Sequence, residues 1–312
     1  MEKRKLGRSD VAITPLMLGT NVMGWNADEA TSHAVLDAFV DLGGNAIDTA
    51  DVYSAWAPGH EGGESERVIG AWLKKSGKRN KVVVATKVGM WPKRLGLKRQ
   101  NILDACDDSL SRLGIETIDL YQLHRDDEAT PAEEYLAALG ELQKAGKVRA
   151  IGASNFKAGR LGDAMRASNE QGLPRFATLQ PEYNLLNREI EADLGPLCVK
   201  EEISLIPYYG LANGYLTGKY RTEADKSKSI RGGRMDKYMQ GKGPAVLAAL
   251  DAIGARLGAT PGQVALAWLM AKPAMAAPIA SATSVAQITE LMGALKVKLS
   301  ATDVAELDKA SA

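Results

Sequence analysis

Four residues that can move a proton stand at or just beyond the ends of three apolar runs. The run "NAI" ends in Asp48, with Tyr53 five residues later, "ATK" ends in Lys87, and "QLH" ends in His124. A phenol, an ammonium, a carboxylate and an imidazole together form a tunable proton donor beside an oxygen that gains negative charge. They suit reduction of a carbonyl, in which hydride reaches carbon and Tyr53 supplies the proton to oxygen.

The charges of this group predict how each member works. A buried ammonium favours the phenolate, so we expect Lys87 to lower the pKa of Tyr53 and Asp48 to keep Lys87 charged. A neutral His124 would hydrogen-bond the substrate oxygen. Each residue alone also has an ordinary structural explanation as a cap, a rim or a core side chain, and only their convergence favours catalysis.

Eight short apolar runs must position these residues. None shows the polar alternation of a sheet with one wet face, so we expect parallel strands buried on both sides. The runs lie near Leu16, Ile47, Val83, Leu120, Ile151, Leu179, Leu205 and Ile279.

Amphipathic segments with apolar residues three and four apart separate these runs and predict helices. They span residues 29–42, 64–75, 101–113, 132–145, 158–171, 189–202, 245–257 and 261–272, and two more follow at 284–295 and 301–310. Eight strand–helix pairs predict an α/β fold, a (β/α)8 TIM barrel forming one domain over residues 1–312. The stretch "KRKLGRSDVAIT" predicts an N-terminal β-hairpin. An open doubly wound sheet is the alternative, but the Gly-rich turn that usually follows its first strand is missing.

The connection at residues 210–243 is much longer than an ordinary loop and has no clear periodicity. Loops of that length are usually functional or disordered. Its many lysines, arginines and glycines fit either a solvated flexible loop or a flap over an anionic ligand.

Composition excludes several classes of protein. A net charge of +1 argues against a dedicated nucleic-acid binder, and three histidines without a Cys/His cluster predict no metal site. Two cysteines, Cys106 and Cys198, indicate reduced thiols, and neither a signal peptide nor a membrane-length apolar run is present. We expect a soluble cytoplasmic enzyme that acts on a small molecule.

Six motifs, in order over nearly the whole chain, resemble the aldo-keto reductase superfamily. They are "GGNAIDTADVYS", "ATKVGMW", "SLSRLGIETIDLYQLH", "GKVRAIGASNF", "QPEYNLLNR" and "GYLTGKY". The resemblance implies a barrel that binds NADP(H) without a Rossmann fold. It also implies a catalytic tetrad of Tyr53, Asp48, Lys87 and His124, and so a carbonyl reductase or alcohol dehydrogenase.

The resemblance further implies cofactor contacts from the strand ends and from a pyrophosphate strap. These residues are Gly19, Thr20, Asp48, Ser154, Asn155, Gln180, Tyr208, Leu211, Gly214, Leu216, Gly218, Lys219, Ser281, Thr283 and Gln287. Among them, Ser154, Asn155 and Gln180 correspond to carboxamide-binding residues, and Tyr208 to the aromatic residue that stacks on nicotinamide.

Two segments depart from the family pattern. After the seventh strand, relatives often have "YSPL" where this chain has "YYGL", so Tyr209 adds bulk near the nicotinamide end. The second departure lies at residues 281–291. Thr283 stands where many relatives carry an arginine for the 2′-phosphate, and Leu291 stands where they carry an adenine-contacting asparagine. A hydroxyl binds a phosphate dianion less strongly than a guanidinium does. NADP(H) is therefore the expected cofactor, with NAD(H) open as an alternative.

Residues of the loops at the rim predict a substrate pocket of mostly aromatic and apolar side chains. They are Trp25, Trp56, Met90, Trp91, Arg125 and Tyr209. The aromatic residues favour aryl or alicyclic carbonyls, and Arg125 favours a polar or anionic group.

Two further functions fit part of the pattern. Potassium-channel β subunits share this fold and tetrad, so a nucleotide-sensing regulatory subunit with little turnover is an alternative. A barrel lyase or isomerase that binds no nucleotide is a third possibility. Asp51 has the spacing of a second acidic candidate, but the sequence assigns it only a place in the turn.

Overall fold

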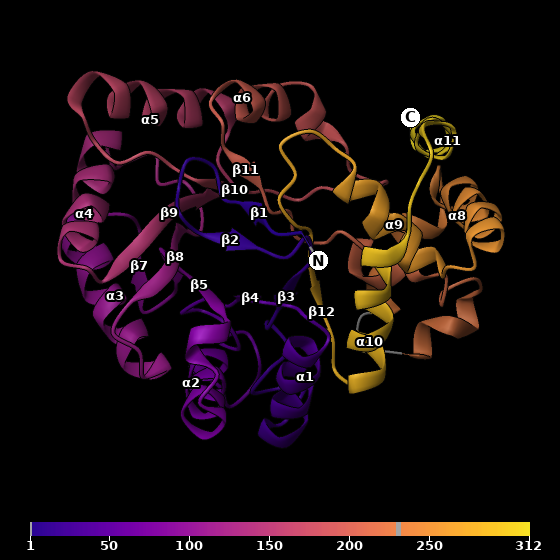
Figure 1. Cartoon of the computed structure of the whole chain (residues 1–312), viewed down its shortest axis with the longest axis horizontal. Coiled ribbons are helices and arrows are strands. Elements are labelled where there is room, and N and C mark those ends of the chain that lie inside the picture. Colours follow the sequence, from indigo (N-terminus) through magenta and orange to yellow (C-terminus); the bar gives the residue numbers. More distant parts are fainter. Residues whose placement is uncertain (1, 229–231) are drawn as a thin grey trace.

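A curled sheet of eight parallel strands forms the centre of the computed structural model, which describes residues 2–228 and 232–312. The strands pair in the order β11–β10–β9–β8–β5–β4–β3–β12, with the helices arranged around them (Figure 1). They are β3 (Met17–Gly19), β4 (Ala46–Asp48), β5 (Val83–Val88), β8 (Ile118–Leu123), β9 (Val148–Ser154), β10 (Thr178–Gln180), β11 (Ser204–Leu205) and β12 (Ile279–Ser281). Each predicted apolar run contains or adjoins one of these strands.

Backbone hydrogen bonds join the two ends of this sheet. The amide of Ala276 donates to Leu205 O at 2.9 Å, and the amide of Ile279 donates to Pro207 O at 2.8 Å. The chain leading into β12 therefore continues the sheet beside β11. The fold is the predicted (β/α)8 barrel, and the open doubly wound sheet is wrong.

Long helices follow the strands and begin and end within two residues of the predicted bounds, with one exception. They are α1 (Glu29–Asp41), α2 (Glu64–Ser76), α3 (Arg99–Leu113), α4 (Ala132–Lys144), α5 (Ala158–Gln171), α8 (Gly243–Leu257), α9 (Pro261–Met270), α10 (Val285–Gly293) and α11 (Ala301–Ala310). Their apolar faces and the outer faces of the strands form the larger hydrophobic cluster.

The exception is the helix predicted at 189–202, which is wrong as a single element. The structure has a 3₁₀ turn, η2 (Glu189–Glu191), and then a short helix, α6 (Leu194–Lys200). Pro196 lacks an amide hydrogen, and its ring would clash with the carbonyl four residues earlier, so no helix continues through it from residue 189. Asp193 instead starts α6, because its side chain accepts a hydrogen bond from Leu194 N.

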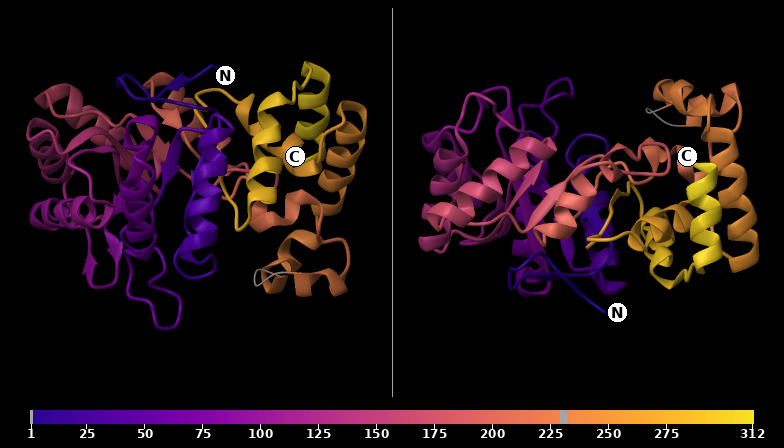
Figure 2. Two further views of the ribbon diagram at one scale, coloured as in Figure 1. Left: turned by 60° about the horizontal axis from the view of Figure 1, so that its bottom comes forward. Right: turned by 90° about the horizontal axis from the view of Figure 1, so that it is seen from above.

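The predicted N-terminal hairpin, β1 (Arg4–Lys5) with β2 (Ala12–Ile13), covers one end of the barrel. Its apolar side chains Leu6, Val11 and Ile13 are buried against residues of the barrel interior such as Ala46 and Val83. Residues 210–228 and 232–243 lie toward the opposite end (Figure 2). The hairpin therefore leaves the other end of the barrel for a site.

A second hairpin, β6 (Met90–Trp91) with β7 (Arg94–Leu95), follows β5 and was not predicted. Each of its strands has only two residues, which is too short for a periodic pattern to be recognised. It carries two of the residues assigned to the substrate pocket, Met90 and Trp91.

The long connection at 210–243 contains short helical turns. They are η3 (Ala212–Thr217), η4 (Glu223–Lys228), η5 (Gly232–Arg234) and α7 (Asp236–Met239), while residues 229–231 of the basic run lie outside the described residues. Tyr215, Tyr220, Met235 and Tyr238 are buried, and η3 and α7 pack on α9 and α8. The turns η3 and α7 are therefore anchored by buried side chains, whereas η4 has no buried residue and fits the interpretation as a solvated loop.

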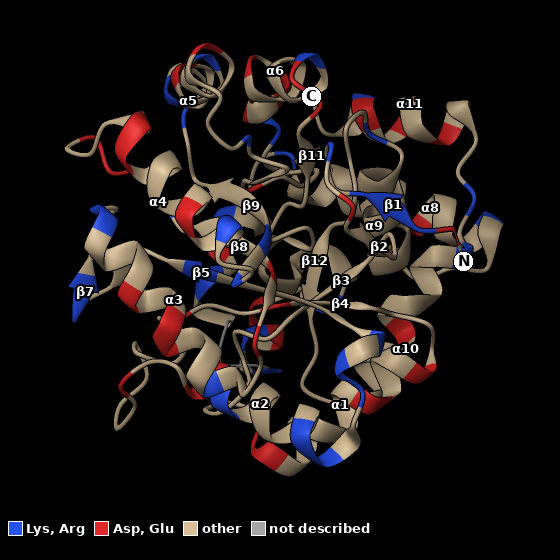
Figure 3. Cartoon of the chain, turned by 60° about the vertical axis from the view of Figure 1, so that its left-hand side comes forward, with Lys and Arg blue, Asp and Glu red and all other residues tan. Residues whose placement is uncertain are grey.

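Charged side chains of both signs alternate along the outer helices (Figure 3). Several form ion pairs between neighbouring elements, such as Arg99 with Glu141 and Arg221 with Asp251. In the described part of the chain, no helix is long and apolar enough to cross a membrane.

Candidate active site

The four residues that the sequence assigns to proton transfer meet at the carboxyl ends of three adjacent strands. Asp48 is the last residue of β4, Lys87 lies near the end of β5, and His124 directly follows β8. These strands are neighbours and parallel, so their ends lie side by side. Tyr53 lies in the turn that leaves β4. The structure thus brings together all four residues that the sequence assigned to the tetrad.

Lys87 is the centre of this cluster and is fully buried. Its Nζ donates to Asp48 Oδ2 at 2.7 Å, to Tyr53 Oη at 2.9 Å and to Thr49 O at 2.7 Å. Three acceptors match the three hydrogens of an ammonium group. Tyr53 Oη lies 3.3 Å from Asp48 Oδ2, and its ring is 6.0 Å from that of His124, centre to centre.

The expectation that the pKa of Tyr53 is lowered is wrong for this structure. Burial and then the negative charge of Asp48 raise the pKa of Tyr53 well above its usual value. The sequence argument counted the attraction of Lys87 but omitted desolvation and the neighbouring carboxylate, which both favour the neutral phenol. Tyr53 therefore holds its proton at neutral pH, as a proton donor must.

Burial also favours the neutral forms of the two basic side chains. It lowers the pKa of Lys87, and Asp48 opposes that effect. Burial, with the charges of Lys87 and Arg125, lowers the pKa of His124 well below its usual value, so the imidazole is neutral as expected. Within the described residues, His124 Nδ1 is buried and has no hydrogen-bond partner.

Two glutamines hold the other oxygen of Asp48. Gln180 Nε2 donates to Asp48 Oδ1 at 2.9 Å, and Gln122 Nε2 lies 3.4 Å from the same atom. Sequence reasoning missed Gln122. It lies two residues before His124 on β8, and because side chains alternate along a strand, this spacing places both on the same face.

Residues assigned to the nicotinamide end form a network beside His124. Tyr208 Oη donates to Asn155 Oδ1 at 2.8 Å, and Asn155 Nδ2 donates to His124 O at 2.9 Å. Ser154 Oγ donates to Gln180 O at 2.8 Å. The ends of β9 and β10 and the Tyr208 side chain are thus joined to the tetrad.

Three residues of the predicted pyrophosphate strap combine backbone freedom with positive charge. They are Gly214, Gly218 and Lys219. Gly214 and Gly218 both have left-handed backbone angles, with φ of +95° and +79°. A Cβ at Gly214 would lie 3.5 Å from Nζ of Lys219, an exposed side chain. Open backbone beside an ammonium suits a phosphate group. The Leu216 side chain is fully buried, and Leu211 packs partly against the core.

The remaining assigned cofactor residues lie around the ends of β3 and β12. Thr20 is buried, and its hydroxyl donates to Asp48 O at 2.8 Å. A Cβ at Gly19 would lie 2.8 Å from Ser281 Oγ, which donates to Asn21. Thr283 uses both its amide and its hydroxyl to contact Gln287 Oε1, at 2.8 and 3.1 Å.

Two tryptophans and a tyrosine line the approach to Tyr53. Trp56 is 52% exposed, and its ring packs edge-on against Tyr53 at 5.9 Å and Trp25 at 6.1 Å. Tyr209 packs on Tyr208 at 5.0 Å. Arg125 is exposed and forms no ion pair with the described residues.

Trp91 lies differently from the other assigned pocket residues. Its Nε1 donates to Glu61 O at 2.8 Å, and the guanidinium of Arg112 lies 5.4 Å from its ring. It therefore supports the loop after Tyr53, while its neighbour Met90 is partly exposed on the same hairpin.

Left-handed backbone angles concentrate around the candidate active site and the predicted strap. Seven non-glycine residues in the described part of the chain have positive φ. Ser54 follows Tyr53, Asn155 contacts His124 O, Tyr209 packs on Tyr208, and Ala212 and Asn213 lie in η3. Such conformations cost of order 1 kcal/mol or more each and cluster at functional sites. Within the described residues, no group of three His, Cys, Asp or Glu is placed to hold a metal ion.

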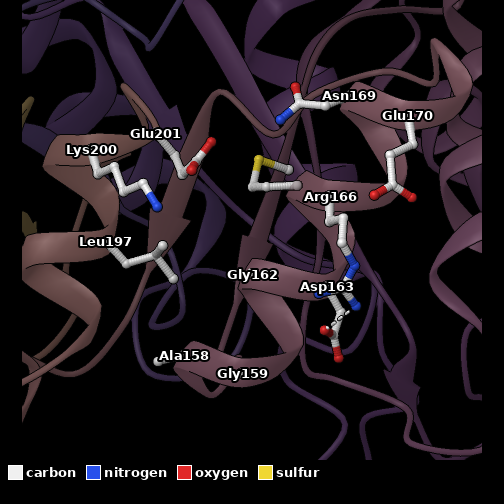
Figure 4. Close-up of a pocket in the computed structure, with 11 residues that line it drawn as sticks. Ala158, Gly159, Gly162, Asp163, Arg166, Asn169, Glu170, Leu197, Lys200 and Glu201 are labelled. Carbon is white, nitrogen blue, oxygen red and sulfur yellow. Dashed lines mark hydrogen bonds and ion pairs between the residues drawn. The ribbon is translucent and has the colours of Figure 1, made fainter.

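A cavity of about 550 Å³ lies elsewhere, between the outer helices α5 and α6 (Figure 4). Its wall carries small and charged residues, including Gly159, Gly162, Asp163, Arg166 and Lys200. No tetrad residue lines it, so this cavity is separate from the candidate active site.

Proton-moving side chains at the carboxyl ends of the strands are the arrangement of a barrel enzyme. The chain belongs to the aldo/keto reductase family, whose model matches residues 15–312. It is therefore an oxidoreductase. It is 33% identical to Protein tas of Escherichia coli over 99% of this chain and 97% of that protein. It is 33% identical to aldo-keto reductase yakc [NADP(+)] of Schizosaccharomyces pombe (98% and 90%) and 29% identical to versiconal hemiacetal acetate reductase of Aspergillus parasiticus (99% and 96%).

Proposed function

We propose that this protein transfers hydride between NADP(H) and an aldehyde or ketone, with Tyr53 as the general acid in reduction and the general base in alcohol oxidation. The observation that carries the proposal is the position of Lys87 Nζ, within hydrogen-bond distance of both Asp48 and Tyr53. Fully buried, this ammonium supports a negative charge on Tyr53 once its proton has left.

The chain's residues fit a nicotinamide dinucleotide at the same end of the barrel. Asn155 and Tyr208 present amide and phenol groups beside His124, and Gly214 with Lys219 forms an open cationic cradle suited to phosphate. When bound, the nicotinamide supplies or accepts the hydride. We place its ring near Tyr208 and its pyrophosphate at the strap.

The name of the Schizosaccharomyces pombe relative, aldo-keto reductase yakc [NADP(+)], supports NADP(H) over NAD(H). At the residue where relatives carry arginine, however, this chain has Thr283, already held by Gln287. A neutral site discriminates less between a 2′-phosphate and a 2′-hydroxyl. We therefore propose NADP(H) as the main cofactor and measurable use of NAD(H).

The proposed chemistry follows from the protonation states of the tetrad. Neutral His124 hydrogen-bonds the carbonyl oxygen and orients it beside Tyr53. As hydride reaches carbon, that oxygen becomes more basic and takes the Tyr53 proton. The phenolate left behind is stabilised by Lys87 at 2.9 Å, and Asp48 and Thr49 O hold the ammonium in place. Alcohol oxidation uses the same contacts in reverse.

We propose that the aryl or alicyclic part of the substrate packs on the exposed face of Trp56, beside Trp25 and Tyr209. Arg125 would then lie near the polar group of the substrate. We also propose a cytoplasmic location, since both cysteines are free and buried.

A panel of carbonyls and alcohols assayed with NADPH, NADH and their oxidised forms tests this function. We expect turnover of 4-nitrobenzaldehyde with NADPH. The kcat of Tyr53→Phe should be about 10²–10⁴-fold lower than that of the wild type. NADPH should still bind to this variant and quench its tryptophan fluorescence. Equal inertness of both proteins across the panel, despite tight NADPH binding, would instead support the nucleotide-sensing alternative.

A further inference from the structure

Asp51 is a buried acid that the proposed chemistry does not use. It lies three residues beyond β4, is 1% exposed, and its amide donates to Lys87 O at 3.3 Å. Neither of its carboxylate oxygens has a hydrogen-bond partner within the described residues. Buried polar groups are nearly always paired, so this one requires an explanation.

A neighbouring acid takes the nearby hydrogen-bond donors. Glu66, on α2, receives Arg112 Nε at 2.6 Å and the hydroxyl of Thr86 at 2.5 Å, and it too is fully buried. Arg112, on α3, is thus bound to Glu66. Two buried acids and one paired guanidinium leave Asp51 without a compensating partner.

The loop that follows Tyr53 closes over Asp51. A Cβ at Gly62 would lie 3.1 Å from Asp51 O and 2.6 Å from Trp91 Nε1, so the chain is closely packed there. Trp91 in turn lies under the guanidinium of Arg112 and holds Glu61 O. Asp51 is therefore enclosed by α2, α3 and this loop.

An enclosed, unpartnered carboxyl group keeps its proton. Burial, followed by the Glu66 carboxylate, raises the pKa of Asp51 to about 8, with Arg112, the backbone amide of Val52 and Lys87 opposing. The other titratable groups whose charge acts around this cluster are Tyr121 on β8 and Cys106 on α3. Burial raises the pKa of both, so neither carries charge at neutral pH.

This inference rests on the proposed role of Tyr53. We propose that Asp51 is a positioning residue for proton transfer. It is a neutral acid close to Lys87, and its ionisation makes Tyr53 a weaker proton donor. While Asp51 is neutral, the Lys87 ammonium is held by Asp48, Tyr53 and the carbonyl of Thr49. An ionised Asp51 places another negative charge near Lys87, which disfavours phenolate at Tyr53 and slows donation of its proton.

The pH dependence of carbonyl reduction tests this inference. For the wild type, kcat/KM for the carbonyl should fall about tenfold between about pH 6.5 and about pH 9, because most of the neutral acid is lost over that interval. Asparagine is isosteric with aspartate and cannot ionise. In Asp51→Asn we therefore expect kcat/KM at about pH 9 to equal the value that the same variant has at about pH 6.5. Asp163→Asn, which changes an exposed carboxylate on α5, should decline as the wild type does.

The same profile separates Asp51 from Lys87 as the source of the decline. Loss of a nearby carboxylate lowers the pKa of an ammonium. If Lys87 were the titrating group, the decline in Asp51→Asn would persist and move to lower pH. Persistence at any pH in this range would overturn the inference.

A measurement on the wild type covers the cases in which Asp51→Asn does not fold or no carbonyl is turned over. In protein labelled with ¹³C at aspartate carboxyl carbons, one resonance should titrate near pH 8. If every aspartate has titrated by about pH 6, Asp51 is not a neutral acid and the inference fails. A titrating resonance in a protein without turnover would retain Asp51 as a buried neutral acid but would reject the proposed reductase function, and with it the role of Asp51 in proton transfer.

Discussion

Gln180 Nε2 donates to one oxygen of Asp48 at 2.9 Å, while Lys87 Nζ holds the other at 2.7 Å. The carboxylate is thus fixed from both sides, and it orients the ammonium that serves Tyr53. A residue assigned from sequence to the nicotinamide carboxamide also supports the tetrad in this structure.

This contact predicts that Gln180→Leu impairs catalysis as well as cofactor binding. Loss of a hydrogen bond to a charged group costs about 1.5–3 kcal/mol. We expect kcat at saturating NADPH to fall roughly tenfold or more, and Tm to fall with it. A rise in the Kd for NADPH with unchanged kcat and Tm would show that Gln180 serves the cofactor alone.

Lys87→Met should destabilise the fold as well as remove activity. The substitution leaves Asp48 buried without its cation, and breaking a buried pair costs about 3–5 kcal/mol. Urea unfolding measures that loss. Adding Asp48→Asn removes the uncompensated charge, so the double variant should regain part of the stability but none of the turnover. A single variant as stable as the wild type would contradict this account.

His124 should make stability depend on pH on the acid side. Its pKa is depressed in the folded protein, so below about pH 6.5 the unfolded chain binds a proton that the folded chain does not. The contribution is present above that pH and is lost as the pH falls. The free energy of unfolding should therefore decline more steeply from pH 7 to pH 5 in the wild type than in His124→Phe. Parallel declines would place the His124 pKa near its ordinary value.

Lys219→Ala should weaken NADPH binding. The exposed ammonium beside Gly214 is placed for a phosphate, and losing one charge-assisted hydrogen bond of about 1.5–3 kcal/mol raises Kd by roughly ten- to a hundredfold. Fluorescence titration at two salt concentrations should also show a smaller salt dependence. Lys226→Ala is the matched control in the same segment, because Lys226 is paired with Glu223 and Asp236. An equal effect of both substitutions would mean that only general charge matters.

The architecture could be predicted because eight apolar runs and the helices between them repeat one simple pattern. The same regularity explains the tetrad: in parallel strands, residues at the carboxyl ends meet wherever the sequence places them. The helical periodicity gave a wrong prediction at residues 189–202, because the ring of Pro196 ends any helix that begins at residue 189.

The residues that surround the tetrad were harder to predict. Glu66 and Arg112 lie on helices whose charged residues usually face solvent, yet they are joined through a contact spanning 46 positions in sequence. Nothing local indicates such a pairing. The state of Tyr53 was misjudged for a related reason, since desolvation depends on all the atoms packed around a group.

The left-handed backbone at Ser54, Asn155, Tyr209, Ala212 and Asn213 has a consequence for engineering. At these positions an ordinary side chain occupies a conformation that glycine would adopt with less strain. Glycine at Ser54, Tyr209 or Ala212 would therefore relieve backbone strain of order 1 kcal/mol at each position, at the cost of the contacts of the side chain that it replaces. Those variants are also the ones in which activity is most at risk, because relaxing the loops releases the side chains that they hold in place.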